Sequence, residues 1–143
     1  MFTRRHALIS AIAILVPFRV AAAQSVIYRN PGCGCCHEWS LLMDKAGFPM
    51  RMEDTDDLAG KLSAIGLPSD LHGCHGGLIG GYAVSGHVPP ADVRRLLDER
   101  PDAIGLTVPG MPMGSPGMGG EPEAFDTLLV KRDGATEIFA SHA

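Results

Sequence analysis

The sequence lacks three features that would each assign it to a large class of proteins. It has no basic stripe, because its 12 Lys and Arg residues are outnumbered by 16 Asp and Glu residues, and this argues against a nucleic-acid partner. No apolar run approaches the length of about 20 residues that a membrane-spanning helix requires. Internal repeats are also absent. These absences leave a single compact domain that binds neither nucleic acid nor, once mature, a membrane.

The apolar run at residues 7–16 is too short to span a bilayer, but its surroundings are typical of an export signal. Arg4 and Arg5 precede it, and three alanines follow it as a cleavage site. We expect residues 1–23 to be removed on export, through the general route or the twin-arginine route. Their removal takes away Arg4, Arg5 and Arg19, so the net charge of −4 becomes −7. The 120 residues that remain of 143 suffice for one domain.

The chain has only four cysteines, and three of them, Cys33, Cys35 and Cys36, stand within four positions. Export to an oxidising compartment makes disulfides feasible, so Cys33 and Cys36 could form a structural bridge, or Cys74 could staple one of the three. Adjacent cysteines such as Cys35 and Cys36 rarely bridge each other. A dithiol redox site needs only two sulfurs, so a third beside them is either an idle thiol or, as we favour, a metal ligand.

Hydrophobic periodicity and Gly/Pro punctuation predict an alternation of strands and helices. The predicted elements are strand 25–29, a helix that is anchored in the core by Trp39 and ends at Gly47, strand 50–52, helix 58–65 capped by Asp56, a hairpin of 78–79 and 82–84 turning at Gly80-Gly81, helix 90–100, and a terminal hairpin of 125–130 and 136–139 turning at Asp133-Gly134. The terminus beyond it, with His142, is expected to fray. Residues 105–122, rich in Gly, Pro and Met, are predicted to form a long functional or mobile loop.

This order of elements, with a CxxC spacing from Cys33 to Cys36 after the first strand, is typical of a thioredoxin-like domain. We therefore predict an α/β protein in which residues 24–104 form the thioredoxin-like domain. Residues 105–143 form a C-terminal extension, made of the Met-rich loop and the terminal β-hairpin, that completes a site. Functional residues in such folds lie at the carboxyl ends of strands, and the cysteine cluster follows a strand directly.

The position of the cluster at a helix start also activates its thiols. The helix dipole and the free N–H groups there lower a cysteine pKa below its ordinary value of about 8.5, so that more thiolate is present. Cys36, together with Cys33, is therefore the candidate for catalytic thiol chemistry.

The hairpin predicted around Gly80-Gly81 places the fourth cysteine. If Ile79 faces Tyr82, paired residues have numbers that sum to 161, so Cys74 lies opposite His87 at a cross-strand Cβ distance of about 5 Å. In a thioredoxin-like sheet this strand runs beside the CxxC motif. Cys74, with its neighbour His75, is thus expected to face the cluster across a small pocket.

Thiolate, imidazole and thioether groups are the ligands that soft, redox-active metals prefer, copper(I) above all. Thioethers need no deprotonation and form no disulfides, so the Met-rich loop is suited to close over such a metal in an oxidising space. The candidate metal ligands are Cys33, Cys35, Cys36, Cys74, His75, His87, Met111, Met113 and Met118.

Four motifs in the same order resemble the CopG-like proteins, a family with a CxCC motif that is exported in Gram-negative bacteria and linked with copper resistance. They are YRNPGCGCC at residues 28–36, CH at 74–75, GHVP at 86–89 and PGMPMGSPGM at 109–118. The resemblance covers nearly all of the mature chain.

The resemblance implies a thioredoxin-like domain whose C-terminal extension helps to bind a multinuclear, cysteine-bridged copper cluster, with a role in interconverting copper(I) and copper(II). Carried over by motif, the ligands are the four cysteines, with the histidines and loop methionines named above as further candidates. The chain departs from the family pattern in the glycines at 73, 76 and 77, where Ser or Thr and bulkier residues are expected. These glycines loosen the backbone that orients His75.

The leading hypothesis is a monomeric periplasmic copper-binding protein of copper resistance, whose pocket can cycle electrons between metal and thiols. Its expected partners are copper ions and periplasmic copper-efflux or copper-carrier proteins. One alternative is a thiol–disulfide oxidoreductase that uses Cys33 and Cys36 on protein or small thiols. Another is a passive copper carrier or store without a redox step.

Overall fold

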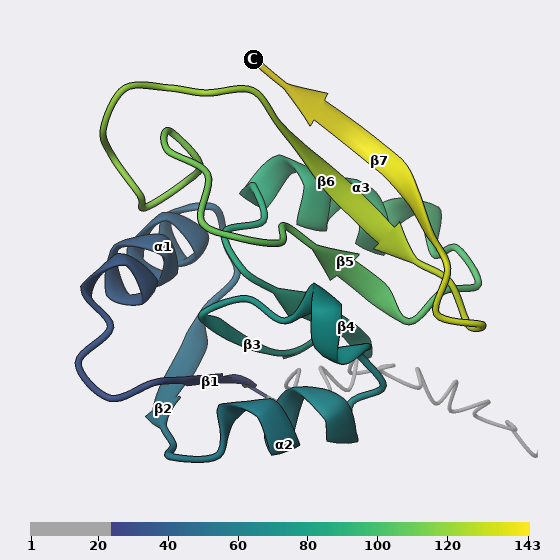
Figure 1. Cartoon of the computed structure of the whole chain (residues 1–143), viewed down its shortest axis with the longest axis horizontal. Helices are drawn as coiled ribbons and strands as arrows, with labels where there is room; N and C mark the ends of the chain where they lie inside the picture. The colour runs from purple at the N-terminus through teal and green to yellow at the C-terminus, as the bar shows by residue number, and fades with distance from the viewer. Residues whose placement is uncertain (1–23) are drawn as a thin grey trace, which may run out of the picture.

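The computed structural model describes residues 24–143, which form a seven-stranded mixed sheet with three α-helices (Figure 1). The predicted export signal, residues 1–23, lies outside the described residues. In chain order the elements are β1 (Ser25–Arg29), α1 (Gly34–Lys45), β2 (Met50–Asp54), α2 (Leu58–Ala64), a 3-10 turn (Ser69–Leu71), β3 (His75–Ile79), β4 (Tyr82–Ser85), α3 (Pro90–Glu99), β5 (Gly105–Thr107), β6 (Phe125–Val130) and β7 (Thr136–His142). Across residues 24–143, no helix has the length and apolar character needed to cross a membrane.

The strands follow the order β2-β1-β3-β4-β5-β6-β7 in one sheet. Strand β1 pairs in parallel with β2, whereas β3 runs antiparallel to both β1 and β4. The predicted α/β class is confirmed, and the thioredoxin-like assignment with a C-terminal extension stays a prediction with which this order of strands agrees. The predicted hairpin register is also present, with Ile79 opposite Tyr82 and Gly76 opposite Ser85.

Side chains alternate between the two faces of the sheet, and each face has its own core. Helices α1 and α3 cover one face, where Trp39 and Leu96 pack with Ile27 and Val84. Helix α2 covers the other face, where Leu62 packs with strand residues such as Ala83 and Val130. Helix α1 is therefore held firmly enough to present its N-terminus at one end of the sheet (Figure 1).

The glycines at 73, 76 and 77 lie where neighbouring backbone or side chains approach closely, so they do not loosen the backbone around His75 as the sequence suggested. A Cβ atom at Gly77 would lie 2.1 Å from the Val26 carbonyl oxygen, and one at Gly73 would lie 2.5 Å from the Gly86 Cα atom. Both contacts are shorter than side chains tolerate. These glycines let β3 pack tightly between its neighbours and so hold His75 in a defined position.

Three details of the structure differ from the sequence prediction. Residues 105–107, predicted to belong to the loop, form strand β5, which pairs in parallel with β4 and antiparallel with β6. The cap of α2 is Asp57, which accepts a hydrogen bond from the Gly60 N–H group, and not Asp56. Strand β7 also continues past Phe139 to His142. Strand β5 thereby joins the C-terminal extension to the same sheet as strands β1 to β4.

Candidate metal centre

The N-terminus of α1 carries the cysteine cluster. Cys33 is the residue before the helix, and its side chain makes no capping hydrogen bond. In the structure Cys33 and Cys36 are joined by a disulfide, while Cys35 and Cys74 are free thiols. The structure thus describes the oxidised form of the CxxC pair, with Cys36 fully buried and the other three cysteines partly exposed.

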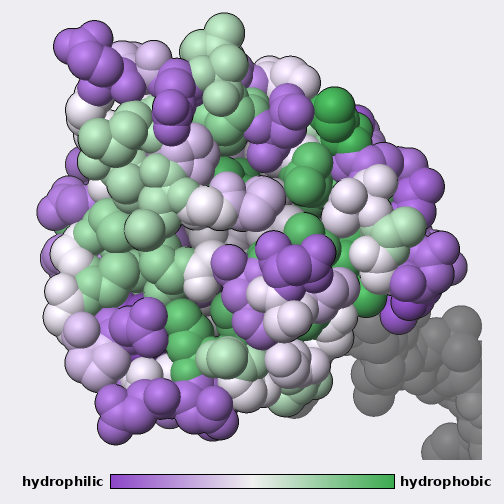
Figure 2. All heavy atoms as spheres, viewed as in Figure 1, coloured by the Kyte–Doolittle hydropathy of each residue, from purple (hydrophilic) through white to green (hydrophobic). Residues whose placement is uncertain are grey.

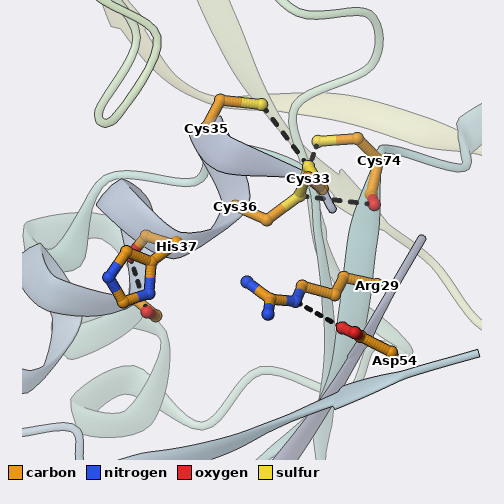
Figure 3. A network of polar contacts seen from close by, with 8 residues as sticks. Arg29, Cys33, Cys35, Cys36, His37, Asp54 and Cys74 are labelled. Atoms are coloured by element: carbon orange, nitrogen blue, oxygen red, sulfur yellow. Dashed lines mark hydrogen bonds and ion pairs between the residues drawn. A yellow bond between two sulfur atoms is a disulfide. The ribbon is translucent and has the colours of Figure 1, made fainter. Parts of the chain in front are cut away.

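All four sulfur atoms lie within 4.8 Å of one another, and Figure 3 shows them gathered at the start of the helix. The Cys33 and Cys35 Sγ atoms are 3.6 Å apart, and the Cys36 and Cys74 Sγ atoms are 3.5 Å apart. Two thiolates bound to one metal at about 2.3 Å in tetrahedral geometry lie about 3.7 Å from each other. These two pairs are therefore spaced as thiolates on one metal ion would be, whereas Cys33 and Cys36, bonded to each other at 2.08 Å, could join such a set only after reduction.

A second donor group shares Cys74 with the first. The Cys74 Sγ atom lies 3.3 Å from His75 Nδ1 and 3.2 Å from His87 Nε2. Both imidazoles are completely buried, and their ring centres are 5.0 Å apart in an edge-on arrangement. Cys74 and His87 are thus in contact, as predicted, although both lie just beyond the β3–β4 ladder, which ends at Gly76 and Ser85, and His75 joins them.

Burial sets the protonation of these side chains. Burial, followed by the charge on His87, lowers the pKa of His75 from 6.5 to about 3. Burial also lowers the pKa of His87, against the opposing effect of the Pro116 carbonyl. For the Cys74 thiol, burial and then the neighbouring Cys35 raise the pKa from 9.0 to about 12. At neutral pH both imidazoles are thus neutral and able to coordinate, while Cys74 keeps its proton until a cation displaces it.

The Met-rich loop reaches this site through its backbone. The Pro116 carbonyl oxygen accepts a hydrogen bond of 2.7 Å from His87 Nδ1. Because a carbonyl oxygen can only accept, Nδ1 carries the hydrogen and Nε2, which faces Cys74, has the free lone pair. Gly117 lies directly against α1, where a Cβ atom would be 2.7 Å from the backbone nitrogen of Trp39.

Comparison with solved structures identifies the family to which this site belongs. The structure of copper resistance protein CopG in its Form 1 is 36% identical, has a TM-score of 0.77, and covers 83% of this chain and 96% of its own. Form 2 is also 36% identical, with a TM-score of 0.78 and coverage of 84% and 98%. The chain belongs to the CopG family. The family resemblance inferred from the four sequence motifs is thereby confirmed.

A family model described as a protein of unknown function, DUF411, matches residues 71–118. That range contains the Cys74-His75 pair, His87 and the Met-rich loop, but not the CxCC motif. No curated protein sequence matches the chain significantly. The assignment to the CopG family therefore depends on the two solved structures.

Of the nine candidate ligands, the structure brings together the four cysteines and both histidines. The loop methionines are placed differently. Met111 and Met113 are 53% and 44% exposed, and Met118 is partly buried. Weakly apolar surface covers the side of the molecule where Figure 1 has α1 and this loop (Figure 2). A ligand role for the three methionines stays a prediction.

Two groups that position the histidines of this CopG-family site could not be identified as such from the sequence. The Pro116 carbonyl is a backbone atom, so residue type does not mark it as a partner of His87. Trp39, predicted only as a core anchor, packs against His75 with ring centres 4.3 Å apart and ring planes tilted by 41°, and it donates its indole N–H to the Val88 carbonyl. It thus packs His75 from one side and ties α1 to the segment that follows His87.

Proposed function

We propose that this protein is a periplasmic copper-binding protein of copper resistance that interconverts copper(I) and copper(II) at the CxCC cluster. The observation that carries the proposal is the meeting of four sulfurs and two imidazoles at the tip of α1, in two groups that share Cys74 and whose potential ligand atoms lie within 4.8 Å of one another. Membership of a family whose solved structures are of a copper resistance protein supports the choice of copper.

In this reaction copper is the substrate, and the thiols are the electron store. Oxidation of Cys33 and Cys36 to a disulfide releases two electrons and two protons. Two copper(II) ions accept those electrons and become two copper(I) ions. The thiolates of Cys35 and Cys74, which are not consumed, are left to bind the product, because soft thiolate ligands favour copper(I). An external dithiol reductant would return the disulfide to two thiols.

The decisive experiment is anaerobic titration of the fully reduced protein with copper(I) against a chromogenic copper(I) chelator. We expect Cys35→Ser to lower the copper(I) stoichiometry or to weaken binding at least tenfold, because a thiolate has been removed from the sulfur group. His37→Asn, a change at an exposed residue on the same helix, is the matched control and should bind as the unchanged protein does. Equal stoichiometry and affinity in Cys35→Ser would remove Cys35 from the ligand set.

A thiol–disulfide oxidoreductase is the second candidate, and the Cys33–Cys36 disulfide at a helix N-terminus favours it. It predicts reduction of insulin disulfides at a rate that does not change when residues 110–119 are deleted. A passive copper carrier predicts instead that copper(II) added to the reduced protein yields no copper(I).

Export to the periplasm is proposed from the basic start, short apolar run and alanine cleavage site of residues 1–23. Mass spectrometry of protein recovered from the periplasmic fraction tests it directly. A mature chain that begins near Gln24 is the expected result.

A further inference from the structure

We propose that the end of the sheet opposite the cysteine cluster binds a single-chain amphiphile with an anionic head group, a fatty-acid carboxylate. The site is a hollow that extends from the first residues of β1 to the turn between β3 and β4. Cys33 follows the other end of β1, and Cys74 precedes the other end of β3. The inference is independent of copper, because no residue of the hollow belongs to either donor group.

The hollow has the size and the lining of a small-molecule site. Its volume is about 900 Å³, within the range usual for such sites. Its walls are mainly apolar and come from separate parts of the chain, with Val26 and Tyr28 from β1, Phe48 from the segment after α1, Ile65 from the end of α2 and Leu78 from β3. An apolar ligand would therefore be enclosed from several sides.

Leu78 marks the part of the sheet that no helix covers. It is 45% exposed, although β3 is an inner strand between β1 and β4. The next residue on the same face is Gly76, where a Cβ atom would lie 2.7 Å from the Leu62 side chain of α2. Helix α2 has only seven residues and ends at Ala64, so it packs over Gly76 and leaves Leu78 open to a ligand.

A second hollow, of about 570 Å³, continues the first and carries positive charge. The two share Ile65, Leu78 and the glycines of the β3–β4 turn, and Arg100 and Arg132 line the second. No Asp or Glu side chain of residues 24–143 lines either hollow, although the chain has 16 acidic residues and 12 basic ones. Apolar walls that end at arginines are complementary to an apolar chain with an anionic head.

Arg100 is fixed at this margin with its charge unpaired. Its Nη1 donates a hydrogen bond of 2.8 Å to the Gly80 carbonyl, and its guanidinium lies 5.0 Å from the centre of the Tyr82 ring. Arg132 is paired with Asp102, whereas no carboxylate of residues 24–143 forms an ion pair with Arg100.

The backbone of Arg100 is also unusual. Arg100 is the only non-glycine residue of the described chain with a positive φ, of 49°, and it ends α3 at a position that ordinarily takes Gly or Asn. A strained backbone of this kind is commonly found at binding sites. An unpaired guanidinium thus occupies a place where glycine would fit the backbone better.

The walls favour a hydrocarbon chain over a peptide strand. Strand β1 lies between β2 and β3, and β3 lies between β1 and β4, so the two strands are already paired on both sides. An extended peptide would find no sheet edge here and would bury its own N–H and C=O groups without partners. A hydrocarbon chain has no such groups, and each methylene that it buries should raise the affinity about fourfold.

The test is calorimetric titration of the chain that begins at Gln24 with octanoate, decanoate and dodecanoate, each below its micelle-forming concentration. We expect one ligand per chain and a gain in affinity of about 15-fold for every two methylenes added. Decyltrimethylammonium, which has a cationic head, should bind at least about tenfold more weakly than decanoate. Equal affinity for the two head groups, or no dependence on chain length, would overturn the proposal.

Leu78→Asp tests the wall of the hollow. It places a carboxylate beside the hydrocarbon chain and should lower the affinity for decanoate at least about tenfold. Leu41→Asp is the matched control, because Leu41 is 44% exposed on α1 and lines neither hollow. It should bind decanoate as the unchanged chain does, and an equal loss in both variants would contradict the assigned site.

Arg100→Gly tests the anionic head. Glycine adopts a positive φ without strain, so the chain should stay folded while the affinity for decanoate falls about tenfold. The affinity for decyldimethylamine oxide, whose head has no net charge, should not change. Arg95→Gln is the control, because Arg95 is already paired with Glu99. If both ligands weaken equally in Arg100→Gly, Arg100 only shapes the hollow and the preference for an anion is refuted.

Other occupants of the hollow give different results, and each would overturn the proposal. Binding to phosphatidylglycerol vesicles but not to decanoate would make this face a membrane contact. A dimer that Leu78→Asp dissociates, without decanoate binding, would make it an interface between two copies. Binding of a peptide of residues 17–23 but not of decanoate would assign it to the export segment. Copper(I) titration of the same variants should be unchanged, so failure here leaves the proposed copper function standing.

Discussion

At Cys74, His75 and His87, burial decides the protonation state more than neighbouring charge does. Desolvation is the largest cause of the pKa shift at each of the three. It disfavours the charged form in every case, so the histidines stay neutral and the cysteine stays a thiol. A cation that enters therefore meets two free imidazole lone pairs and displaces one proton from sulfur. These three side chains are therefore uncharged in the metal-free protein at neutral pH.

The shifted pKa of His75 predicts how stability depends on pH. Because the folded pKa of about 3 lies below the ordinary value of 6.5, the stability that neutral His75 contributes is present above pH 6.5 and is lost as the pH falls toward 3. Between about pH 6.5 and pH 5.0 the loss from this residue is about 2 kcal/mol in the free energy of unfolding. Urea unfolding of the metal-free disulfide form at the two pH values measures it.

His75→Asn should show a smaller fall in stability over this pH interval than the unchanged chain, whatever its stability near neutral pH. The exposed residue His37 provides the control, and His37→Asn should keep the full pH dependence. The same pH dependence in His75→Asn and the unchanged chain would contradict the buried, neutral state assigned to His75.

At the level of the element, the segment after β5 works as an ordered strap across the tip of α1. Its own hydrogen bonds, from the Gly114 N–H to the Gly119 carbonyl and from the Met118 N–H to the Ser115 carbonyl, give it a defined shape. Gly117 lets the strap lie directly against α1, and the Pro116 carbonyl accepts a hydrogen bond from His87 Nδ1. The strap therefore contributes to the candidate metal centre by orienting His87, independently of whether its methionines bind copper.

Gly117→Ala tests this role of the strap. Gly117 has φ +90°, and a Cβ atom there would lie 2.7 Å from the backbone nitrogen of Trp39 and 2.9 Å from the Cys35 carbonyl oxygen. The strap should lift from α1 and break the Pro116–His87 hydrogen bond, so that metal affinity falls about tenfold or more. Nitrogen NMR of the His87 ring should show the hydrogen no longer confined to Nδ1.

Gly110→Ala is the matched control for this experiment. Gly110 also has a positive φ, of +74°, but a Cβ atom there meets nothing within 4 Å. It should carry a similar backbone cost of about 1 kcal/mol while leaving metal affinity and the His87 tautomer unchanged. If both variants lower metal affinity equally, the effect is one of backbone strain and not of contact with α1.

At the level of the whole molecule, the last strand is tied back to the start of α3. His142 Nε2 lies 2.8 Å from Asp92 Oδ2, and the buried Thr127 hydroxyl donates to the same oxygen at 2.6 Å. Phe125 stacks on the His142 ring at 4.8 Å. The sequence prediction of a terminus that frays at His142 is therefore wrong, because β7 extends to His142 and the His142 ring is held by Asp92 and Phe125.

His142→Ala should lower the free energy of unfolding by about 1–3 kcal/mol, because Asp92 loses a hydrogen-bond partner while it stays buried. Thermal or urea unfolding measures the change. Ser141→Ala removes a hydrogen bond to Asp126 on the exposed side of the same strand and should cost no more than about 0.5 kcal/mol. An equal fall in the free energy of unfolding in the two variants would show that the contact of His142 with Asp92 stabilises the fold no more than an exposed hydrogen bond does.

Much of the centre was predictable because its signals are local. The CxCC motif stands where a strand passes into a helix, and the Gly80-Gly81 turn sets a register that brings Cys74 to His87. Periodicity and turn chemistry act over a few residues, so the sequence alone determined the α/β order of residues 25–99 and the meeting of the sulfurs with the two histidines, and its four motifs determined the family. Strand β5 was missed because its three residues have no period of their own and become a strand only between β4 and β6.

Only the tertiary structure decided how the parts of the centre are held. The Pro116 carbonyl meets His87 across 29 residues of sequence, and His142 meets Asp92 across 50. Neither contact has a sequence pattern, because the first uses a backbone atom and the second depends on how far β7 extends along β6. The division of the six donors into two groups that share Cys74 is likewise set by distance. The residue types indicate which side chains can donate to a metal, and tertiary packing determines which of them lie close together.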